Sequence, residues 1–197
     1  METMKVKLVG TVPVIMHSNR AANPLSKEAK ALKQLTSKRN KTDKDHEEIA
    51  RIEWEAGLYL KNGVVVMPAQ NVEKCFLLGA RKSKNGKQFE SGVYLSDLYM
   101  PMEYKGPKIR VTENGFPNAQ LDRFYPSHNW QEMVKVGTQQ VLRTRPIFEE
   151  WSFACDIDYD SNIINEAVLM DCLKDAGKLI GLCERRPRYG RFNIEVL

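Results

Sequence analysis

The sequence predicts an α+β fold whose elements follow the βαββαβ order of the split βαβ, or ferredoxin-like, fold. Three observations support this prediction. Segments near both ends of the chain alternate apolar and polar residues, as strands with one buried face do. Two inner segments carry apolar residues at helical spacing. Two long polar stretches, 17–60 and 105–140, are predicted to be large insertions in a single domain spanning residues 1–197.

The chain opens with a predicted strand at residues 4–16, in which Val6 and Leu8 alternate with polar residues. Gly10 inside this segment predicts a bend or a bulge. Residues 17–42 are rich in Asn, Ser, Lys and Arg. We expect this stretch to be an exposed, partly mobile excursion that begins the first insertion.

The next part of the chain alternates helix and strand signals. Residues 43–60 place apolar side chains near helical spacing behind a capping aspartate, which predicts a helix. The apolar run 64–67 predicts a short buried strand, and the segment 68–81 predicts a second helix. The basic segment 81–87 contains Asn85-Gly86, a dipeptide favoured in tight turns, so it predicts a hairpin.

The remaining elements complete the predicted sheet. They are two strands at 94–104 and 108–112, an irregular segment at 113–140, an antiparallel pair of strands at 141–147 and 150–158, a helix at 165–176 and a strand at 192–196. The chain therefore ends with a strand, a helix and a strand, as the βαββαβ order requires.

The composition favours a soluble protein that is attracted to polyanions. The formal net charge is +5 and the pI is about 9.0. Four cysteines lie in apolar stretches without CxxC spacing, which predicts buried free thiols in a reducing compartment. No signal-peptide pattern and no run near the roughly 20 apolar residues of a membrane span occur. We expect a cytoplasmic protein that does not associate with a membrane.

Residues 177–196 carry the most informative chemistry, because they hold three glycines, four arginines and one tyrosine. Arginine pairs with phosphates through two donors and stacks on bases, tyrosine offers a stacking face, and glycine allows a positive φ or a close approach to another chain. These properties suit single-stranded nucleic acid, and the alternative is a solvated loop. The candidate nucleic-acid-binding residues are Arg185, Arg186, Arg188, Tyr189, Arg191, Gly181 and Gly190, with Lys82, Lys84 and Lys87 in the basic turn and Arg20, Lys38 and Arg39 in the first insertion.

Other kinds of chemistry find less support. Asp156, Asp158 and Asp160 recur at every second position but lack the glycine and glutamate of a calcium loop, so we place them on one solvated strand face. His17 follows the first strand, and it is a candidate nucleic-acid-binding residue or the general base of a metal-independent ribonuclease. No phosphate loop or dinucleotide fingerprint occurs. We therefore expect a non-enzymatic protein without a cofactor or a metal.

The segment 181–192, Gly-Leu-Cys-Glu-Arg-Arg-Pro-Arg-Tyr-Gly-Arg-Phe, resembles the glycine-rich motif of the CRISPR-associated RAMP superfamily, whose members carry RRM-like folds. Residues 10–16 look like the first strand of that superfamily, and residues 65–72 look like its strand-to-helix step. Small phage-encoded proteins end similarly. We therefore expect a free-standing phage relative that acts in the cytoplasm of the host cell.

The resemblance implies an RRM-like protein that binds a nucleic-acid strand as an oligomer or filament. In that superfamily, backbone-type subunits stack along a guide RNA and hold it by the glycine-rich loop, the loop before the first helix and a thumb-like hairpin. It assigns Gln70 and Asn71 to the helix start, and Gly181, Arg185, Arg186, Arg188 and Gly190 to the glycine-rich turn. Single-stranded RNA or DNA is the expected partner. The alternatives are a phage protein–protein interaction module, a CRISPR-interfering module and the ribonuclease.

Overall fold

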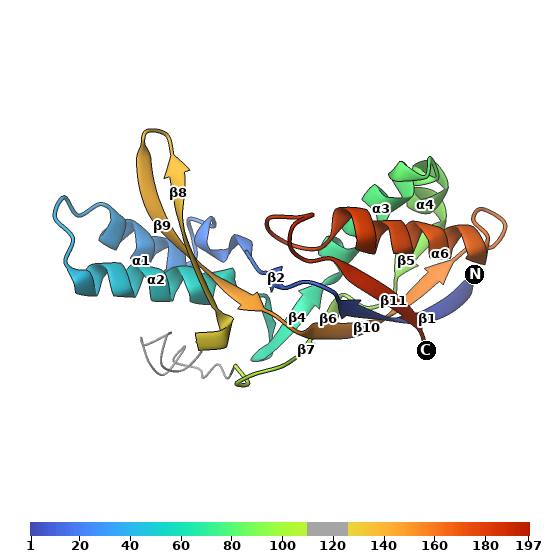
Figure 1. The fold of residues 1–197 in the computed structure, drawn as a ribbon, viewed down its shortest axis with the longest axis horizontal. Coiled ribbons are helices and arrows are strands. Elements are labelled where there is room, and N and C mark those ends of the chain that lie inside the picture. The colour runs from blue at the N-terminus through green and yellow to red at the C-terminus, as the bar shows by residue number, and fades with distance from the viewer. Residues whose placement is uncertain (110–125) are drawn as a thin grey trace. The chain divides into compact units, whose positions relative to one another are not determined.

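The computed structural model describes residues 1–109 and 126–197, and the chain divides into two compact units. The first unit comprises Met1–Val14, Val65–Lys105 and Phe148–Leu197, and the second comprises Ile15–Val64 and Gly106–Ile147. The second unit contains nearly all of both expected insertions. The fold is α+β, and the paired strands of the described residues are antiparallel, as Figure 1 shows.

The first unit is built on one antiparallel sheet in which the strands follow the order β11-β1-β10-β5. These strands are β1 (Glu2–Gly10), β5 (Val93–Leu95), β10 (Trp151–Tyr159) and β11 (Phe192–Val196), and the short β7 (Glu103–Tyr104) also pairs with β10. Alternate residues of β1 are buried, as the sequence pattern predicts, so that Val6 and Leu8 lie in the core. The predicted strand at 4–16 breaks after Gly10, and Val14–Ile15 forms the separate short strand β2.

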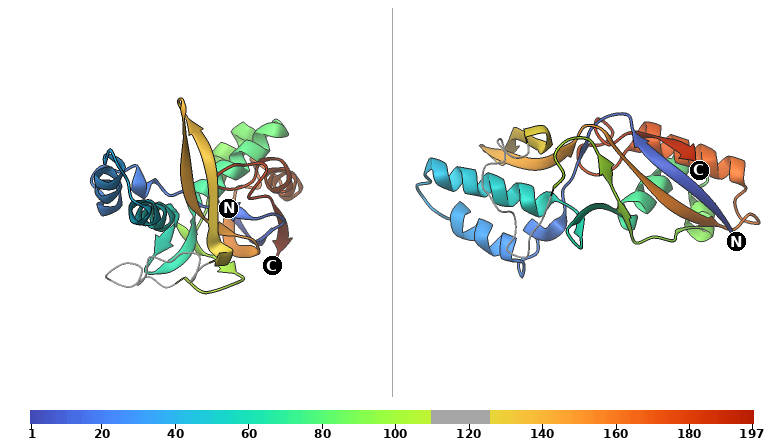
Figure 2. Two further views of the ribbon diagram at one scale, coloured as in Figure 1. Left: turned by 60° about the vertical axis from the view of Figure 1, so that its left-hand side comes forward. Right: turned by 90° about the horizontal axis from the view of Figure 1, so that it is seen from below.

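One face of this sheet is covered by helices (Figures 1 and 2). They are α3 (Ala69–Lys82), α4 (Gly86–Gly92) and α6 (Glu166–Asp175), which continues as the π-helical turn η3 (Ala176–Ile180). Helix α3 buries Val72, Cys75 and Phe76, and α6 buries Leu169 and Leu173, at the spacing of one helical face. Both predicted helices, at 68–81 and 165–176, are therefore confirmed.

The predicted hairpin at 81–87 is wrong, because this segment joins α3 to α4. Lys84 adopts a positive φ of 64°, and the amide of Asn85 donates to the carbonyl of Ala80 at 2.8 Å. This is the hydrogen bond of a Schellman motif, which satisfies a carbonyl left open at the end of α3. Asn85-Gly86 marks a turn, as predicted, but the turn connects two helices.

The rest of the first unit differs from the expected single strand at 94–104. This region forms β5, β6 (Tyr99–Pro101) and β7, because the chain crosses from the main sheet to a smaller one. In the smaller sheet, β6 pairs with β4 (Val64–Pro68), the predicted buried strand at 64–67. The short strand β3 (Leu60–Lys61) precedes β4 along the chain.

The second unit contains two helices and a long hairpin. Helix α1 (Lys27–Thr36) begins where the hydroxyl of Ser26 accepts from the amide of Ala29. Helix α2 (Asp43–Gly57) begins at a capping box between Thr42 and Asp45, which confirms the helix predicted at 43–60. The hairpin pairs β8 (Asn129–Val136) with β9 (Gln139–Phe148), and the 3-10 turns η1 (Asn19–Ala21) and η2 (Pro126–His128) complete the described elements.

Most residues of the excursion at 17–42 are exposed, as expected, and the excursion contains helix α1, because Ser26 caps a helix within the polar sequence. Two other expectations in this part of the chain are wrong. The segment expected to be irregular contains β8, whose side chains are mostly exposed and therefore lack an apolar alternation. The strands predicted at 141–147 and 150–158 exist as β9 and β10 but do not pair with each other, because β9 pairs with β8 and β10 with β1. The strand predicted at 108–112 lies largely outside the described residues.

No helix in the described ranges is long and apolar enough to cross a membrane.

Candidate nucleic-acid interface

The glycine- and arginine-rich loop, residues 181–191, joins η3 to β11, and backbone hydrogen bonds anchor it at both ends. The amide of Leu182 donates to the carbonyl of Gly190 at 2.8 Å, which closes the base of the loop. The amide of Gly190 donates to the carbonyl of Pro13, also at 2.8 Å, and the amide of Thr11 donates to the carbonyl of Arg191 at 2.9 Å. The loop is thus anchored to the end of β1 by the backbone.

Two glycines are required at the base of this loop. Gly181 and Gly190 have φ angles of +78° and +74°, which side-chain-bearing residues rarely adopt. A Cβ atom on Gly190 would lie 2.0 Å from the carbonyl oxygen of Leu182, and one on Gly181 would lie 2.8 Å from that of Tyr189. The positive φ expected from the sequence is confirmed, and the close approach is to the loop's own backbone.

The loop presents its guanidinium groups to solvent. Arg185, Arg186, Arg188 and Arg191 are exposed, whereas Tyr189 is half-buried. Within the described ranges, the side chains of Arg186, Arg188 and Arg191 form no ion pair and no hydrogen bond. A guanidinium group without an internal partner keeps all five of its donors for water or a ligand.

The loop lies against the start of α3. Asn71 lies in the first turn of α3, and its side-chain amide points toward the sulfur of Cys183 at 3.9 Å and that of Met67 at 4.0 Å. Gln70 is exposed on the same turn. The structure therefore brings Asn71 together with the loop and leaves Gln70 open to solvent.

The three lysines of the basic turn lie elsewhere. Lys82, Lys84 and Lys87 lie at or beyond the end of α3 that is far from Asn71. A helix rises about 1.5 Å per residue, so the 14 residues of α3 separate the two ends by about 21 Å. The lysines form a second basic cluster on the first unit that is separate from the loop.

The candidate residues of the first insertion belong to the second unit, and some of them have internal partners. The guanidinium group of Arg20 donates to the carbonyls of Glu55 and Leu58 at the end of α2 and lies 3.5 Å from the carboxylate of Glu28. Lys38 pairs with Asp45 at 2.6 Å. Arg39 and His17 are exposed, and the carbonyl of His17 accepts from the hydroxyl of Tyr59 at 3.0 Å. The side chain of Arg20 thus caps the C-terminal end of α2 by donating to its last carbonyl groups.

The sheet face opposite the helices is acidic. Asp156 pairs with Lys5 at 3.2 Å, Glu103 pairs with Lys7 at 2.8 Å, and Asp158 accepts from the hydroxyl groups of Thr3 and Ser96, each at 2.6 Å. These hydrogen bonds hold the pKa of Asp158 below its usual value. Asp156 and Asp158 do lie outward on the strand, as predicted. Four carboxylates, those of Asp156, Asp158, Glu103 and Glu195, face two lysines here, so this face does not suit a polyanion.

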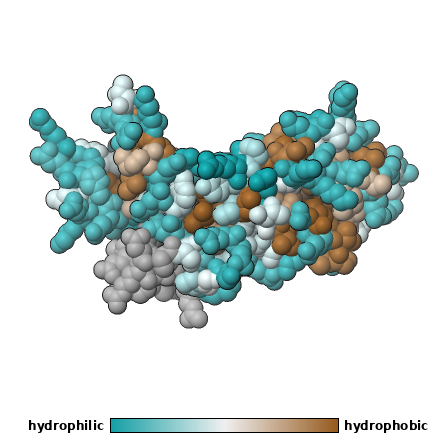
Figure 3. Space-filling model, viewed as in Figure 1, coloured by the Kyte–Doolittle hydropathy of each residue, from teal (hydrophilic) through white to brown (hydrophobic). Residues whose placement is uncertain are grey.

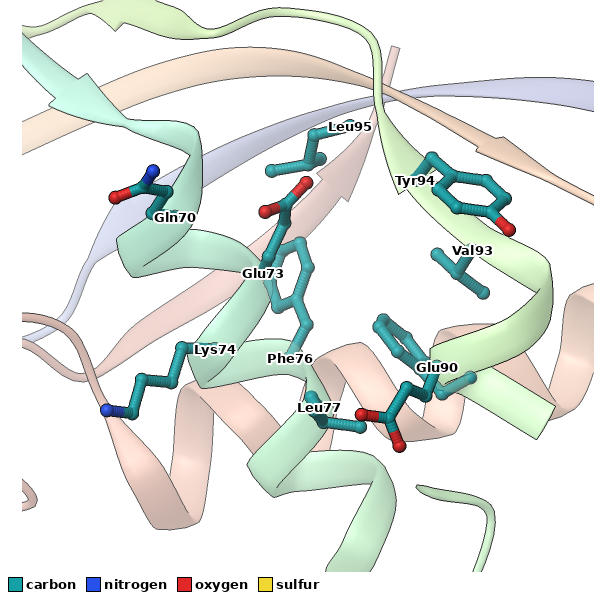
Figure 4. A pocket seen from close by; sticks show the side chains of 10 residues that line it. Gln70, Glu73, Lys74, Phe76, Leu77, Glu90, Val93, Tyr94 and Leu95 are labelled. Carbon is teal, nitrogen blue, oxygen red and sulfur yellow. The ribbon is translucent and has the colours of Figure 1, made fainter. Parts of the chain in front are cut away.

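A hollow of about 450 Å³ lies between α3, α4 and β5 (Figure 4). Its floor is apolar and includes Phe76, Leu77 and Leu95. Figure 4 shows the carboxylate of Glu73 beside Leu95, while the side chain of Lys74 points away from the hollow. An apolar floor with a carboxylate at its rim disfavours phosphate groups, so the arginines of the loop remain the better candidate for nucleic acid.

Burial keeps three of the cysteines in the thiol form. Burial raises the pKa of Cys75, Cys155 and Cys183 to about 12, so these cysteines are protonated at neutral pH. In residues 1–109 and 126–197, no group of three or more His, Cys, Asp or Glu side chains is arranged to hold a metal ion. The buried thiols predicted from the apolar surroundings of the cysteines are confirmed at Cys75, Cys155 and Cys172.

Two basic residues were missed by the sequence analysis. Lys174 on α6 and Lys178 on η3 are exposed and, with Arg191, line a groove beside β11. Their spacing of four residues places them on one side of a helix, which was the available signal. The apolar stripe of the same helix identifies its buried face but does not point to these lysines.

No protein-family model matches this chain, and no curated protein sequence is significantly similar to it. The geometry of the chain itself therefore has to indicate the function.

Proposed function

We propose that the first unit binds single-stranded RNA or DNA without catalysis, through the glycine- and arginine-rich loop. The observation that carries this proposal is the set of exposed arginines on a loop whose backbone is fixed at both ends. Arg186 and Arg188 lack internal partners in the described part of the chain and are therefore available to phosphates. Because the backbone hydrogen bonds to Gly190 hold the loop in place, little backbone entropy is lost when a strand binds.

The arrangement of the first unit supports an RRM-like assignment within this proposal. We propose that this unit is a βαββαβ unit, which is supported by its strand order β11-β1-β10-β5 and by the positions of α3 between β1 and β5 and of α6 between β10 and β11 along the chain. The sheet face that aromatic residues use for stacking in many RRM domains is acidic here. We therefore propose that the strand runs past the loop and the start of α3, near Gln70 and Asn71, as in the RAMP superfamily that the loop resembles.

We also propose that several copies bind side by side along one strand. Contacts to phosphates and stacking on Tyr189 carry no strong sequence preference, so every register of the strand is a comparable site. The expected behaviour is a stoichiometry that rises with the length of the oligonucleotide.

The test is fluorescence anisotropy with labelled single-stranded RNA, single-stranded DNA and duplex DNA at several salt concentrations. Two variants with the same change of charge are compared: the Arg185, Arg186, Arg188→Ala variant and the Lys82, Lys84, Lys87→Ala variant. Loss of about three phosphate contacts should reduce the slope of log affinity against log salt by about 2 in the arginine variant. Equal slopes in the arginine variant and the wild type would refute the assignment of the loop.

A further inference from the structure

Strand β11 lies at the edge of the main sheet and has only β1 as a neighbour among the strands that the structure describes. The amide of Thr11 donates to the carbonyl of Arg191, and the amide of Leu197 donates to the carbonyl of Lys5, both at 2.9 Å. Antiparallel pairing alternates, so the odd-numbered residues of β11 exchange hydrogen bonds with β1. The N–H and C=O groups of Ile194 and Val196 therefore point toward the open edge.

The open edge is partly apolar. Val196 is 58 % exposed, and it lies on the same face of the strand as Ile194, because alternate residues share a face. Figure 3 shows hydrophobic side chains gathered around the C-terminal end of β11, where Figure 1 places the end of the chain. An apolar strip along an unpaired strand edge is the kind of surface that an added strand covers.

A groove of about 510 Å³ runs between this edge strand and the helical side of the unit. Lys174, Lys178 and Arg191 line it, against one carboxylate, that of Glu195. None of the three cations has an ion-pair partner in residues 1–109 and 126–197. The groove therefore carries an uncompensated positive charge beside the unpaired backbone groups.

We propose that β11 accepts an acidic, extended segment of a partner protein as an additional strand of the main sheet. An extended peptide offers alternating N–H and C=O groups, which match those of Ile194 and Val196. Acidic side chains on the same segment complement Lys174 and Lys178. Apolar side chains on it cover Val196.

The charge of the groove distinguishes this occupant from two others. A second copy of the chain would bring its own Lys174, Lys178 and Arg191 to the same edge, and the like charges would repel. A nucleic-acid backbone would pair with the cations, but its phosphates supply no donors for the outward carbonyls of β11. The edge of β11 shares Arg191 with the loop but uses neither Arg185, Arg186 nor Arg188, so variants of those three arginines test the nucleic-acid site alone.

The test uses a fluorescein-labelled peptide with the repeat Glu-Thr-Val-Thr, measured by anisotropy against the full chain. Alternate residues of a strand share a face, so the glutamates and valines of this peptide lie together on the side that carries Val196, Lys174 and Lys178. Two control peptides replace the glutamates with lysine, or a central residue with proline. The acidic peptide should bind saturably below about 1 mM, and both controls should bind at least about tenfold more weakly. Absence of saturable binding of the acidic peptide would overturn the proposal.

Protein variants locate the site. Val196→Pro removes an outward N–H without removing a hydrogen bond to β1, and Lys174→Glu with Lys178→Glu reverses the charge of the groove. Each variant should weaken peptide binding by about tenfold or more. The matched control, Lys82→Glu with Lys84→Glu, changes the net charge equally at the far end of α3 and should leave peptide binding within about threefold of the wild type.

Three results would overturn the proposal even if the peptide binds. The first is unchanged affinity in Val196→Pro with an unaltered circular dichroism spectrum. The second is an equal loss in the charge-reversed control, which would show attraction to the net charge of the protein. The third is a dimer in sedimentation analysis that Val196→Pro abolishes, since this edge would then pair with a second copy. Loss of RNA binding in the arginine variant affects none of these measurements.

Discussion

Replacement of Gly190 by alanine should destabilise the first unit by about 2–5 kcal/mol. A side-chain-bearing residue at a φ of +74° costs about 1–2 kcal/mol. The new Cβ atom would lie 2.0 Å from the carbonyl oxygen of Leu182, so the backbone must move. That movement breaks the hydrogen bonds from Leu182 to Gly190 and from Gly190 to Pro13, each of which contributes about 0.5–1.5 kcal/mol.

Alanine variants of two other glycines distinguish the energy cost of a positive φ from the cost of a steric clash. Gly137 in the β8–β9 turn has a φ of +61°, and a Cβ atom added there would have no atom within 4 Å, so alanine should cost only the strain, about 1 kcal/mol. Gly181 has a φ of +78°, and its Cβ would lie 2.8 Å from the carbonyl oxygen of Tyr189. Gly181→Ala should therefore fall between Gly137→Ala and Gly190→Ala.

The assay is urea unfolding followed by circular dichroism, with each free energy taken from the transition that the substitution moves. If the two units unfold separately, Gly137→Ala shifts the unfolding transition of the second unit, and the other two variants shift that of the first unit. Gly190→Ala within about 0.5 kcal/mol of Gly137→Ala would refute the argument that contact with Leu182 sets the cost.

Three further predictions concern other parts of the chain. Arg20→Ala should destabilise the second unit by about 2–3 kcal/mol in urea unfolding, because the carbonyl groups at the end of α2 lose a charged hydrogen-bond donor. The same variant should leave the salt dependence of RNA binding unchanged. The thiols of Cys75, Cys155 and Cys183 should react slowly with a disulfide reagent at pH 8 in the native protein and quickly in urea, since burial raises each pKa to about 12; rapid native reaction of all three would contradict this. The pKa of Asp158 is lowered in the folded state, so the contribution of its carboxylate to folding stability is present above the ordinary aspartate pKa and is lost as the pH falls. Asp158→Asn should therefore be less stable than the wild type at pH 7 and equally stable near pH 2. A stability difference that persists in acid would exclude the charged hydrogen bonds as its cause.

The elements with apolar periodicity were predictable from the sequence. The strand around Val6 and Leu8 and the helix that buries Leu169 and Leu173 bury alternate or helically spaced residues, so the pattern records their position in the core. Strand β8 carries no such record, because most of its side chains are exposed and its pairing with β9 positions it. Pairing of β10 with β1 joins residues about 150 positions apart, which local patterns do not encode.

The candidate site was predictable in composition but only partly in geometry. The glycine content of residues 177–196 indicated positive φ angles or close approach, and two of the three glycines, Gly181 and Gly190, have a positive φ. The sequence did not indicate that Lys82 and its neighbours lie at the opposite end of α3 from the loop, since that separation follows from the direction of the helix in the fold. The sequence also did not indicate that the guanidinium group of Arg20 donates to carbonyl groups at the end of α2. A basic residue in a polar stretch gives the same sequence pattern whether its side chain is solvated or hydrogen-bonded within the protein.

The distribution of charge on the first unit bears on how it would hold a strand. On the open sheet face, lysines pair with carboxylates of the same face, as Lys5 does with Asp156 and Lys7 with Glu103. This face therefore offers a polyanion no net attraction. Arg186, Arg188 and Arg191 keep their donors in the described part of the chain, and they lie on backbone that is anchored through Gly190 and Pro13. A strand that contacts only one anchored loop makes few contacts per subunit, so its affinity for one copy is low and each copy contributes only a modest salt dependence. High affinity would then require several copies on one strand, because linked contacts multiply the effective concentration of each subunit. This is the physical reason why the length of the oligonucleotide, rather than its sequence, should control binding.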